Sequence, residues 1–566
     1  MTRPSLAQAM AWHPEALTEV GAQWNAAAGR LQISADTVGG ALRPEGWTGA
    51  AARAAGEAIS PAVEELRQIC RALVIAAAEA RDAALSIDAA RDRVLTVLAE
   101  ARQAGCPVAD DGNVSAPGTA SELLVACSGG SSEAAAALSA VRAAELTRRL
   151  QDALTGLGDA DRDAARAIDA AFGVAPASGA VRPAGTADPA VADWPSLSQD
   201  RIAEQIAAMS PDERQRLIEQ RPEQAGNTDG VPWQMRVAAN RINIASAILG
   251  ERRTLARPVE DKLRAAVSPR LTPADAERLW ATLHADPALR SAAIAAHDRD
   301  ARCRIAYYET LLADVSDPVD RERRVPRQIL AFDPARASLI EMSGDLDHAR
   351  AVGVLVPGLN TTFDGSADDM ATARRFVAGA GGDVAMISYL GGPFPTGELV
   401  AGLADAADAH YALEMAPRLV AFSEDVERQA GNRPVTYVGH SYGGSIVGTA
   451  ERFGLTADRV IYVEAAGAGV GVHDPADWHD RNPAVLRFSM TAPGDPISVV
   501  QGIPFGSHGA DPDQMAGVIP LAPGRRLTGG AMIGPSTHSD VLTEPSDAWR
   551  NILAVITGDR EHIRVG

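Results

Sequence analysis

A serine at position 441 stands between glycines directly after an apolar, β-branched run, in the sequence VTYVGHSYGG of residues 435–444. Gly439, Ser441 and Gly443 form the pattern Gly-x-Ser-x-Gly at a predicted strand-to-helix junction. In such a turn a strained backbone lifts the hydroxyl clear of the sheet, and side chains at the flanking positions would clash with neighbouring elements. The pattern predicts a nucleophilic Ser441, with the N–H of Tyr442 directed at a developing oxyanion. The alternative is an ordinary glycine-rich turn.

Two further side chains would have to activate this serine, because a hydroxyl is a weak nucleophile without a base and an orienting acid. At a turn of this type the acid and then the histidine follow the serine along the chain. Asp495, beyond the second predicted strand after Ser441, is favoured over Glu464, which could lie within its own strand, although both stay open. Chain order favours His538, in a predicted loop ahead of the final helix, over the alternative base His508.

A second oxyanion donor is expected in the loop that follows the apolar run of residues 351–358. There the backbone N–H of Gly358 or Leu359 would point toward the serine. Asn360 could add a side-chain donor or could only shape the turn, and these two alternatives are equally favoured.

Strand-like apolar runs dominate the chain from about residue 328, and helical segments separate most of those after residue 357. The runs are residues 328–333, 337–343, 351–358, 383–391, 434–441, 458–467 and 484–495. Near-continuous apolar strands that alternate with helices indicate a mostly parallel sheet with helices on both faces. Ligands of such sheets bind at the carboxyl ends of the strands, which is where the candidate residues lie.

The N-terminal half of the chain is predicted to be mainly helical. Residues 1–105 are alanine-rich and predict two long antiparallel helices, with a turn forced by Pro44 and Gly46. Residues 106–193 supply a loop, a further helix and an Ala/Pro/Gly-rich linker that marks the main domain boundary. One domain is then expected over residues 194–566, with a helical preamble at 194–320 and the catalytic sheet at 321–566.

Composition narrows the classes of partner. The 566 residues carry a formal net charge of −20, which argues against nucleic acid or an anionic membrane surface. No run approaches the roughly 18 apolar residues of a membrane span, and the N-terminus lacks the apolar core of a signal peptide. We therefore expect no integral membrane segment, and either a cytoplasmic location or export without an ordinary signal peptide.

A loop rich in His and Asp superficially suggests a metal site. It contains His473, Asp474, Asp477, His479 and Asp480. The two histidines are six residues apart in a Pro-interrupted loop, so they share no helical face. We expect a polar loop here, and no metal or cofactor in the protein.

Two resemblances extend these interpretations. Residues from about 195 to 566 resemble an α/β-hydrolase family of unknown function from high-GC Gram-positive bacteria, through the stretches RPEQAGNTDGVPWQMRVAANR, VLVPGLNTTFDG, ISYLGGPFP, VTYVGHSYGG and HGADP. The resemblance implies an α/β-hydrolase fold with Ser441, Asp495 and His538 as the triad. The Trp47-Thr48-Gly49 turn of the N-terminal region resembles the WXG-type helical hairpins exported by type VII secretion systems.

The leading functional hypothesis is a serine hydrolase that cleaves a carboxylic ester through a covalent acyl-enzyme. The long helical stretch of residues 398–429 would favour an ester with a lipid-like or bulky group if it covered the pocket. The alternative is a secretion-associated interaction or effector protein, whose hairpin binds another helical hairpin and whose hydrolase fold is inert or a toxic cargo.

Overall fold

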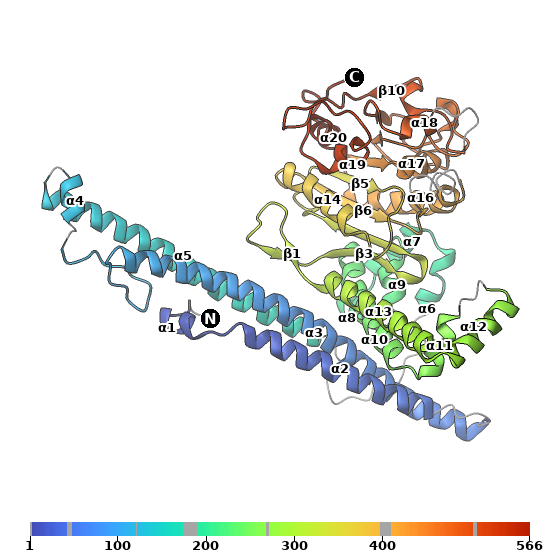
Figure 1. Cartoon of the computed structure of the whole chain (residues 1–566), viewed down its shortest axis with the longest axis horizontal. Helices are drawn as coiled ribbons and strands as arrows, with labels where there is room; N and C mark the ends of the chain where they lie inside the picture. The colour runs from blue at the N-terminus through green and yellow to red at the C-terminus, as the bar shows by residue number, and fades with distance from the viewer. Residues whose placement is uncertain are drawn as a thin grey trace. The chain divides into compact units, whose positions relative to one another are not determined.

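The structure is a computed structural model of the chain. It describes residues 3–41, 48–119, 122–128, 130–173, 189–267, 271–396, 409–501 and 507–566 (Figure 1). The chain divides into two compact units. The first comprises Met1–Ala184 and Ala245–Ala313, and the second comprises Gly185–Ile244 and Asp314–Gly566.

The first unit is helical. Helix α2 (Glu15–Ala41) and helix α3 (Ala50–Gln103) run antiparallel, since Gly39 of α2 faces Val63 of α3 and Gly21 faces Ala77. The predicted pair of long helices is thus confirmed, whereas residues 42–47, which include Trp47, lie outside the described residues. The later half of α3 packs on α5 (Ser132–Gly173) through an apolar cluster that includes Val94, Leu98, Leu146 and Leu150.

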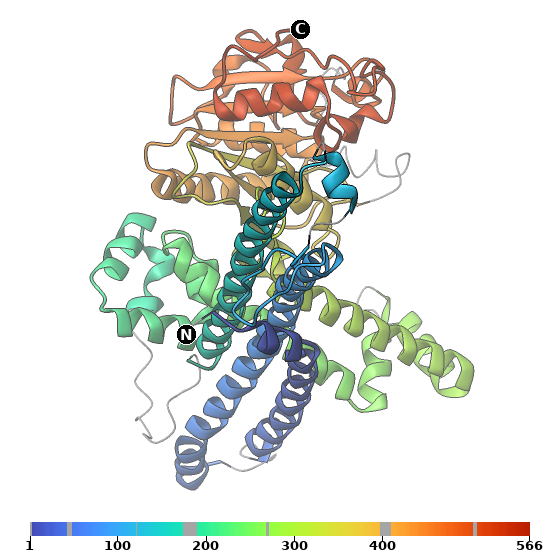
Figure 2. The same cartoon turned by 90° about the vertical axis from the view of Figure 1, so that its left-hand side faces the viewer.

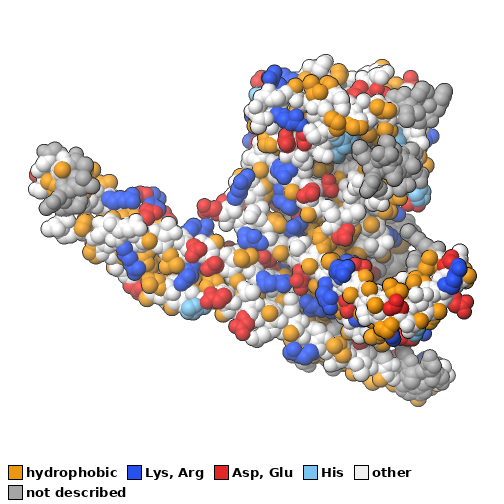
Figure 3. Space-filling model, in the orientation of Figure 1, with side chains coloured by type: hydrophobic (Ala, Val, Ile, Leu, Met, Phe, Trp, Pro, Cys, Tyr) orange, Lys and Arg blue, Asp and Glu red, His pale blue; other side chains and the backbone are white. Residues whose placement is uncertain are grey.

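Shorter helices complete the first unit. They are α1 (Leu6–Ala11), α4 (Glu122–Cys127), α11 (Val259–Ala266), α12 (Pro273–Ala285), α13 (Pro287–Leu312) and the second half of α10 (Trp233–Ala256). Acidic and basic side chains are interspersed over the face that Figure 3 shows. Of the helices that the structure describes, none is long and apolar enough to cross a membrane.

The second unit is built on an eight-stranded sheet with the strand order β10-β9-β8-β7-β5-β6-β4-β3. Its strands are β3 (Gln328–Asp333), β4 (Ser338–Ser343), β5 (Ala351–Val356), β6 (Val384–Leu390), β7 (Val435–His440), β8 (Arg459–Val463), β9 (Leu486–Met490) and β10 (Val518–Pro520). Strand β4 is antiparallel to both of its neighbours, and the remaining pairs are parallel. The expected mostly parallel sheet is therefore confirmed.

Helices cover both faces of this sheet because successive residues of each strand point to opposite sides. Val354 of β5 and Tyr437 of β7 pack toward α16 (His410–Ala430) and α17 (Tyr442–Arg452). Their neighbours Leu355 and Val438 pack instead toward α14 (Ala367–Gly379) and α20 (Asp547–Thr557). Both faces are thus buried, which explains why the strands read as continuous apolar runs. Figure 2 shows the same layers from a second side.

Helices before the sheet complete this unit, and a buried ion pair attaches them to it. They are α6 (Pro189–Ala192), α7 (Gln199–Ala207), α8 (Pro211–Gln220), α9 (Pro222–Asn227) and the first half of α10. Arg236 of α10 donates to the carbonyl of Leu330 in β3 at 2.7 Å and to the carboxylate of Asp425 in α16 at 2.9 Å. Asp425 is fully buried and also accepts from the indole N–H of Trp233 at 2.9 Å.

Candidate active site

The predicted nucleophile turn joins β7 to α17. Ser441 has φ 56° and ψ −121°, a conformation that non-glycine residues rarely adopt. Its N–H donates to the carbonyl of Val463 at 3.0 Å, and its carbonyl accepts from the N–H of Ala466 at 2.9 Å. The end of β8 therefore holds the strained serine in place from both sides of its backbone.

The glycines around the serine have no room for side chains. A Cβ atom at Gly439 would lie 2.7 Å from the Cα of Gly444, and one at Gly443 would lie 2.1 Å from the carbonyl oxygen of Val356. At Gly444 it would lie 2.4 Å from the Cβ of Ala465. The sequence pattern thus reflects the close approach of α17 to β5 and β8.

The loop after β5 approaches the serine. Strands β5 and β7 are parallel neighbours, with Val356 opposite Gly439. A Cβ atom at Gly358 would lie 2.6 Å from the Cβ and 3.0 Å from the Oγ of Ser441, so the backbone of this loop faces the hydroxyl group. Leu359 is half-buried next to it, and Asn360 turns the chain with φ 66° while its N–H donates to the carbonyl of Pro395 at 2.9 Å.

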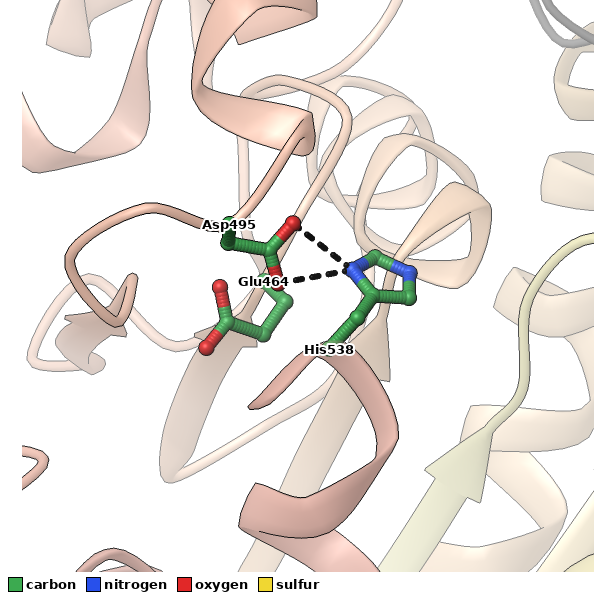
Figure 4. A group of neighbouring side chains, drawn as sticks. All are labelled: Glu464, Asp495 and His538. Carbon is green, nitrogen blue, oxygen red and sulfur yellow. Dashed lines mark hydrogen bonds and ion pairs between the residues drawn. The ribbon is translucent and has the colours of Figure 1, made fainter. Parts of the chain in front are cut away.

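Asp495 and His538 form a hydrogen-bonded pair (Figure 4). The Nδ1 atom of His538 lies 3.1 Å and 3.0 Å from the two carboxylate oxygens of Asp495. Asp495 is buried in the loop after β9 and also accepts from the N–H of Ile497 at 2.8 Å. His538 lies in the first turn of α19 (Thr537–Thr543), so its expected position in a loop is wrong. Ser441 and Asp495 thus follow the carboxyl ends of β7 and β9, whereas His538 comes from a helix.

The electrostatics of the pair favour an ionised Asp495. Burial by itself raises the pKa of this carboxyl group, but hydrogen bonds from His538 and from the N–H of Ile497 outweigh it and lower the pKa below its ordinary value. An ionised Asp495 requires the proton of a neutral His538 to be on Nδ1. The Nε2 atom is then left as a proton acceptor, as a general base needs.

A further histidine connects the predicted base to the turn of the predicted nucleophile. His440, directly before Ser441, donates from Nε2 to the carbonyl oxygen of His538 at 2.6 Å, and the two ring centroids are 5.0 Å apart. Burial, followed by the charge of His538, lowers the pKa of His440 to about 3, so this ring is neutral. Sequence reasoning missed this residue, whose only signal is its place inside the Gly-x-Ser-x-Gly pattern.

Glu464, the alternative acid, is a close neighbour of the pair. It directly follows β8 and is fully buried, and its Oε1 atom accepts from the N–H of Ala492 at 3.0 Å. Burial, reinforced by the adjacent Asp495, raises its pKa to about 9. One oxygen from each carboxyl group and one ring nitrogen of His538 all lie within 4.8 Å of one another (Figure 4). Glu464 is therefore a neutral acid that lies next to the ionised Asp495.

The same three side chains have the composition of a metal site. Their arrangement suits hydrogen bonding better, because both oxygens of Asp495 already face the Nδ1 atom of His538.

The polar loop at 473–480, the other candidate metal site, has carboxylates that are engaged in hydrogen bonds and an ion pair. The carboxylate of Asp477 accepts from the N–H groups of His473 and Asp474, and Asp480 pairs with Arg487.

His508, the alternative base, is buried against the start of α17. Its Nδ1 atom lies 2.8 Å from the hydroxyl of Ser445, one turn along α17 from Ser441. Its ring packs edge-on against Tyr442 with centroids 5.1 Å apart. The structure thus pairs His538 with Asp495 and His508 with Ser445.

Comparisons with known proteins agree with this architecture. Residues 333–504, a segment that contains Ser441 and Asp495, match a protein family described as alpha/beta hydrolase. The chain is 26% identical over 341 residues to two uncharacterized proteins of Mycobacterium tuberculosis, MT2140 of strain CDC 1551 / Oshkosh and Rv2079 of strain ATCC 25618 / H37Rv. The alignment covers 56% of this chain and 45% of either relative, so the chain spans less than half the length of these curated relatives. No solved structure matches the chain. The C-terminal region is an α/β-hydrolase fold.

Proposed function

We propose that the protein is a serine hydrolase that cleaves a carboxylic ester, with Ser441 as nucleophile, His538 as base and Asp495 as orienting acid. The observation that carries the proposal is the hydrogen bond between the buried Asp495 and the half-buried His538, beside the strained turn of Ser441. His440 connects the two parts, because it is covalently adjacent to the serine and hydrogen bonded to the backbone of His538. This arrangement would supply a nucleophile, a base and an orienting group beside the carboxyl ends of β7 and β9.

The proposed reaction has two steps. In the first, Nε2 of His538 takes the proton of the Ser441 hydroxyl while Oγ bonds to the acyl carbon of the ester. The N–H groups of Tyr442 and of the Gly358–Leu359 loop stabilise the oxyanion, and His538 then protonates the departing alkoxide as the ester C–O bond breaks. In the second, water loses a proton to His538 and its oxygen bonds to the acyl carbon. The bond between that carbon and Oγ of Ser441 then breaks, and His538 returns the proton to Oγ, which releases the acid and restores the serine.

The surroundings of the site favour an ester with a bulky or lipid-like group. Helix α16 begins next to the nucleophile turn, since the N–H of Ala412 donates to the hydroxyl of Tyr442 at 3.3 Å. The helix expected over residues 398–429 is described from residue 409 onward, and residues 397–408 lie outside the described residues. The apolar face of an amphipathic helix beside a catalytic serine would supply one wall of an acyl-binding site.

A fluorophosphonate probe and nitrophenyl esters of short and long chain length test the proposal. Wild-type protein should be labelled covalently and should hydrolyse at least one ester, whereas Ser441→Ala should do neither. Ser539→Ala is the matched control, because Ser539 is an exposed serine next to His538 on the same helix. Folded wild-type protein that is neither labelled nor active would contradict the proposal.

A second candidate function rests on the helical hairpin of the first unit. Helices α2 and α3 carry exposed apolar side chains, among them Ile33 at 58% and Leu85 at 58% exposure. We propose as the alternative that this hairpin binds a helical hairpin of another protein, as the WXG resemblance implies, while the hydrolase fold is inert. An inert fold would leave the fluorophosphonate unreacted, so the same probe separates the two candidates.

A further inference from the structure

We infer that Glu464 is a positioning residue of this site: as a neutral acid it donates a hydrogen bond to the carboxylate of Asp495 and holds that carboxylate against His538. The inference rests on the proposed function, because it assigns a role within the Ser441–His538–Asp495 site. It extends that function, because Glu464 acts through Asp495 and touches neither the serine nor the substrate in the proposed reaction.

The backbone fixes where the Glu464 carboxyl group lies. Glu464 has φ 45°, a left-handed conformation that costs a non-glycine residue on the order of 1 kcal/mol. Its N–H donates to the carbonyl of Met490 at the end of β9 at 2.8 Å. Its Oε1 atom accepts from the N–H of Ala492, three residues before Asp495. The end of β9 thus holds both the backbone and one oxygen of the side chain.

The surroundings of the second carboxyl oxygen of Glu464, Oε2, favour a proton on this atom. Oε2 is buried and has no donor directed at it within the described part of the chain. A buried carboxylate oxygen without a donor is costly, whereas a protonated oxygen can itself donate to a neighbouring acceptor. The neighbouring acceptor is the carboxyl group of Asp495, one oxygen of which lies within 4.8 Å of an oxygen of Glu464. The geometry therefore places the shared proton on Oε2.

The charges around the two carboxyl groups agree with this assignment. The titratable groups that face Glu464 are Asp495 after β9, His538 on α19 and Asp513 in the short helix η4 (Pro512–Gln514). Two buried carboxylates in contact cannot both be ionised at neutral pH. Asp495 has a second donor in His538 and a third in the N–H of Ile497, so it keeps the negative charge. Among the described residues, the N–H of Ala492 is the one donor to Glu464, so Glu464 keeps the proton.

This arrangement has a consequence for catalysis. At neutral pH the Glu464 hydroxyl fixes one face of the Asp495 carboxylate without adding charge. When pH rises through the pKa of Glu464, at about 9, the hydrogen bond is lost and two adjacent carboxylates repel each other. We expect Asp495 to move away from His538 and the activity to fall.

Three variants test the inference through the rate of fluorophosphonate labelling as a function of pH. Glu464→Gln keeps a neutral donor of the same shape and should retain activity within about threefold at pH 7, but without the fall near pH 9. Glu464→Leu removes the donor and should be on the order of 10-fold slower than wild type at pH 7, a part of the roughly 10²–10⁴-fold contributed by general acid–base catalysis, with no further fall near pH 9. Asp513→Asn removes an exposed nearby charge and should keep the alkaline fall.

An infrared measurement makes the test independent of activity. Wild-type protein and Ser441→Ala should both show a carboxylic-acid band at pH 7 that disappears above pH 9 and is missing from the spectrum of Glu464→Gln, whereas the band of the other buried acid, Glu451, whose pKa burial raises to about 8, should be present in all three proteins. Absence of the Glu464 band, or the same alkaline fall in wild type and Glu464→Gln, would overturn the inference even if Glu464→Leu failed to fold. Wild-type protein that shows the band but is not labelled would instead overturn the proposed function, and with it any catalytic role for Glu464.

Discussion

His440 donates a 2.6 Å hydrogen bond from Nε2 to the carbonyl oxygen of His538, although the two residues are 98 positions apart in the chain. The residue next to the proposed nucleophile therefore holds the backbone of the proposed base. Because burial lowers the pKa of His440 to about 3, this donor stays neutral and unchanged at any pH where the enzyme would work.

Substitution of His440 should therefore slow the reaction without shifting the acidic limb of the curve of labelling rate against pH. We expect His440→Phe to reduce the labelling rate about 10-fold, because His538 loses its anchor, while the midpoint of the acidic limb stays where it is in wild type. The exposed His562 provides the matched control, His562→Phe, which should match wild type. A shifted midpoint in His440→Phe would show that His440 itself titrates in the reaction.

Substitution of Asp495 separates the two candidate acids. An asparagine would present an amide that can donate to Nδ1 of His538 and so favour the wrong tautomer, for which losses of about 10⁴-fold in kcat are known. We expect Asp495→Asn to lose activity on this scale toward nitrophenyl esters. If Glu464→Gln were inactive and Asp495→Asn active, Glu464 would be the orienting acid instead.

A methyl group at Gly358 should close the oxyanion site. The added Cβ would lie 2.6 Å from the Cβ of Ser441, so the loop must move away from the serine. Loss of one oxyanion donor costs about 10²–10³-fold in kcat, and we expect Gly358→Ala to fall by at least 10²-fold. Gly530 has open space around it and provides the control Gly530→Ala, which should keep wild-type kcat. Equal activity in both variants would rule out a role for this loop.

Much of the fold is predictable because both faces of the sheet are buried. All seven apolar runs are strands, since such runs have no polar face to present to water. Strand β10 was missed because it has only three residues. The antiparallel direction of β4 was also missed, although the connection Pro334–Arg336 from β3 is too short for the crossover that parallel neighbours need.

The site is predictable to the extent that it depends on local sequence. The glycines around Ser441 mark a close backbone approach, which a pattern can reveal. The contact of His440 with His538 and the contact of Glu464 with Asp495 join residues distant in sequence and depend on tertiary packing. No pattern in the sequence alone predicts that these residues are in contact.

The buried ion pair between Arg236 and Asp425 should be essential for stability. Removing one member of a buried pair typically costs about 3–5 kcal/mol when the other charge is left without a partner. Because Arg236 also pairs with Asp229 at 2.8 Å, we expect Asp425→Asn to destabilise the second unit by an amount at the lower end of this range, about 3 kcal/mol, as measured by urea unfolding. Asp200 is the control, because it pairs with Arg428 at the surface with 78% of its side chain exposed, and Asp200→Asn should change stability little. Equal losses of stability in Asp425→Asn and Asp200→Asn would contradict the expectation that the buried pair contributes more than the exposed one.

The proton on Glu464 should also make stability depend on pH. The folded state keeps this proton up to about pH 9, whereas an unfolded glutamate loses it near 4.5. Between these values the folded state binds more protons, so the stability that Glu464 contributes is fully present below about pH 4.5 and is lost as pH rises toward 9, at no more than about 1.4 kcal/mol per pH unit. The free energy of unfolding of Glu464→Gln should fall less steeply over this window. Pulse proteolysis in urea from pH 6 to 9, followed on peptides from β7 and β8, measures both slopes, and parallel slopes would mean that Glu464 is already ionised in the folded protein.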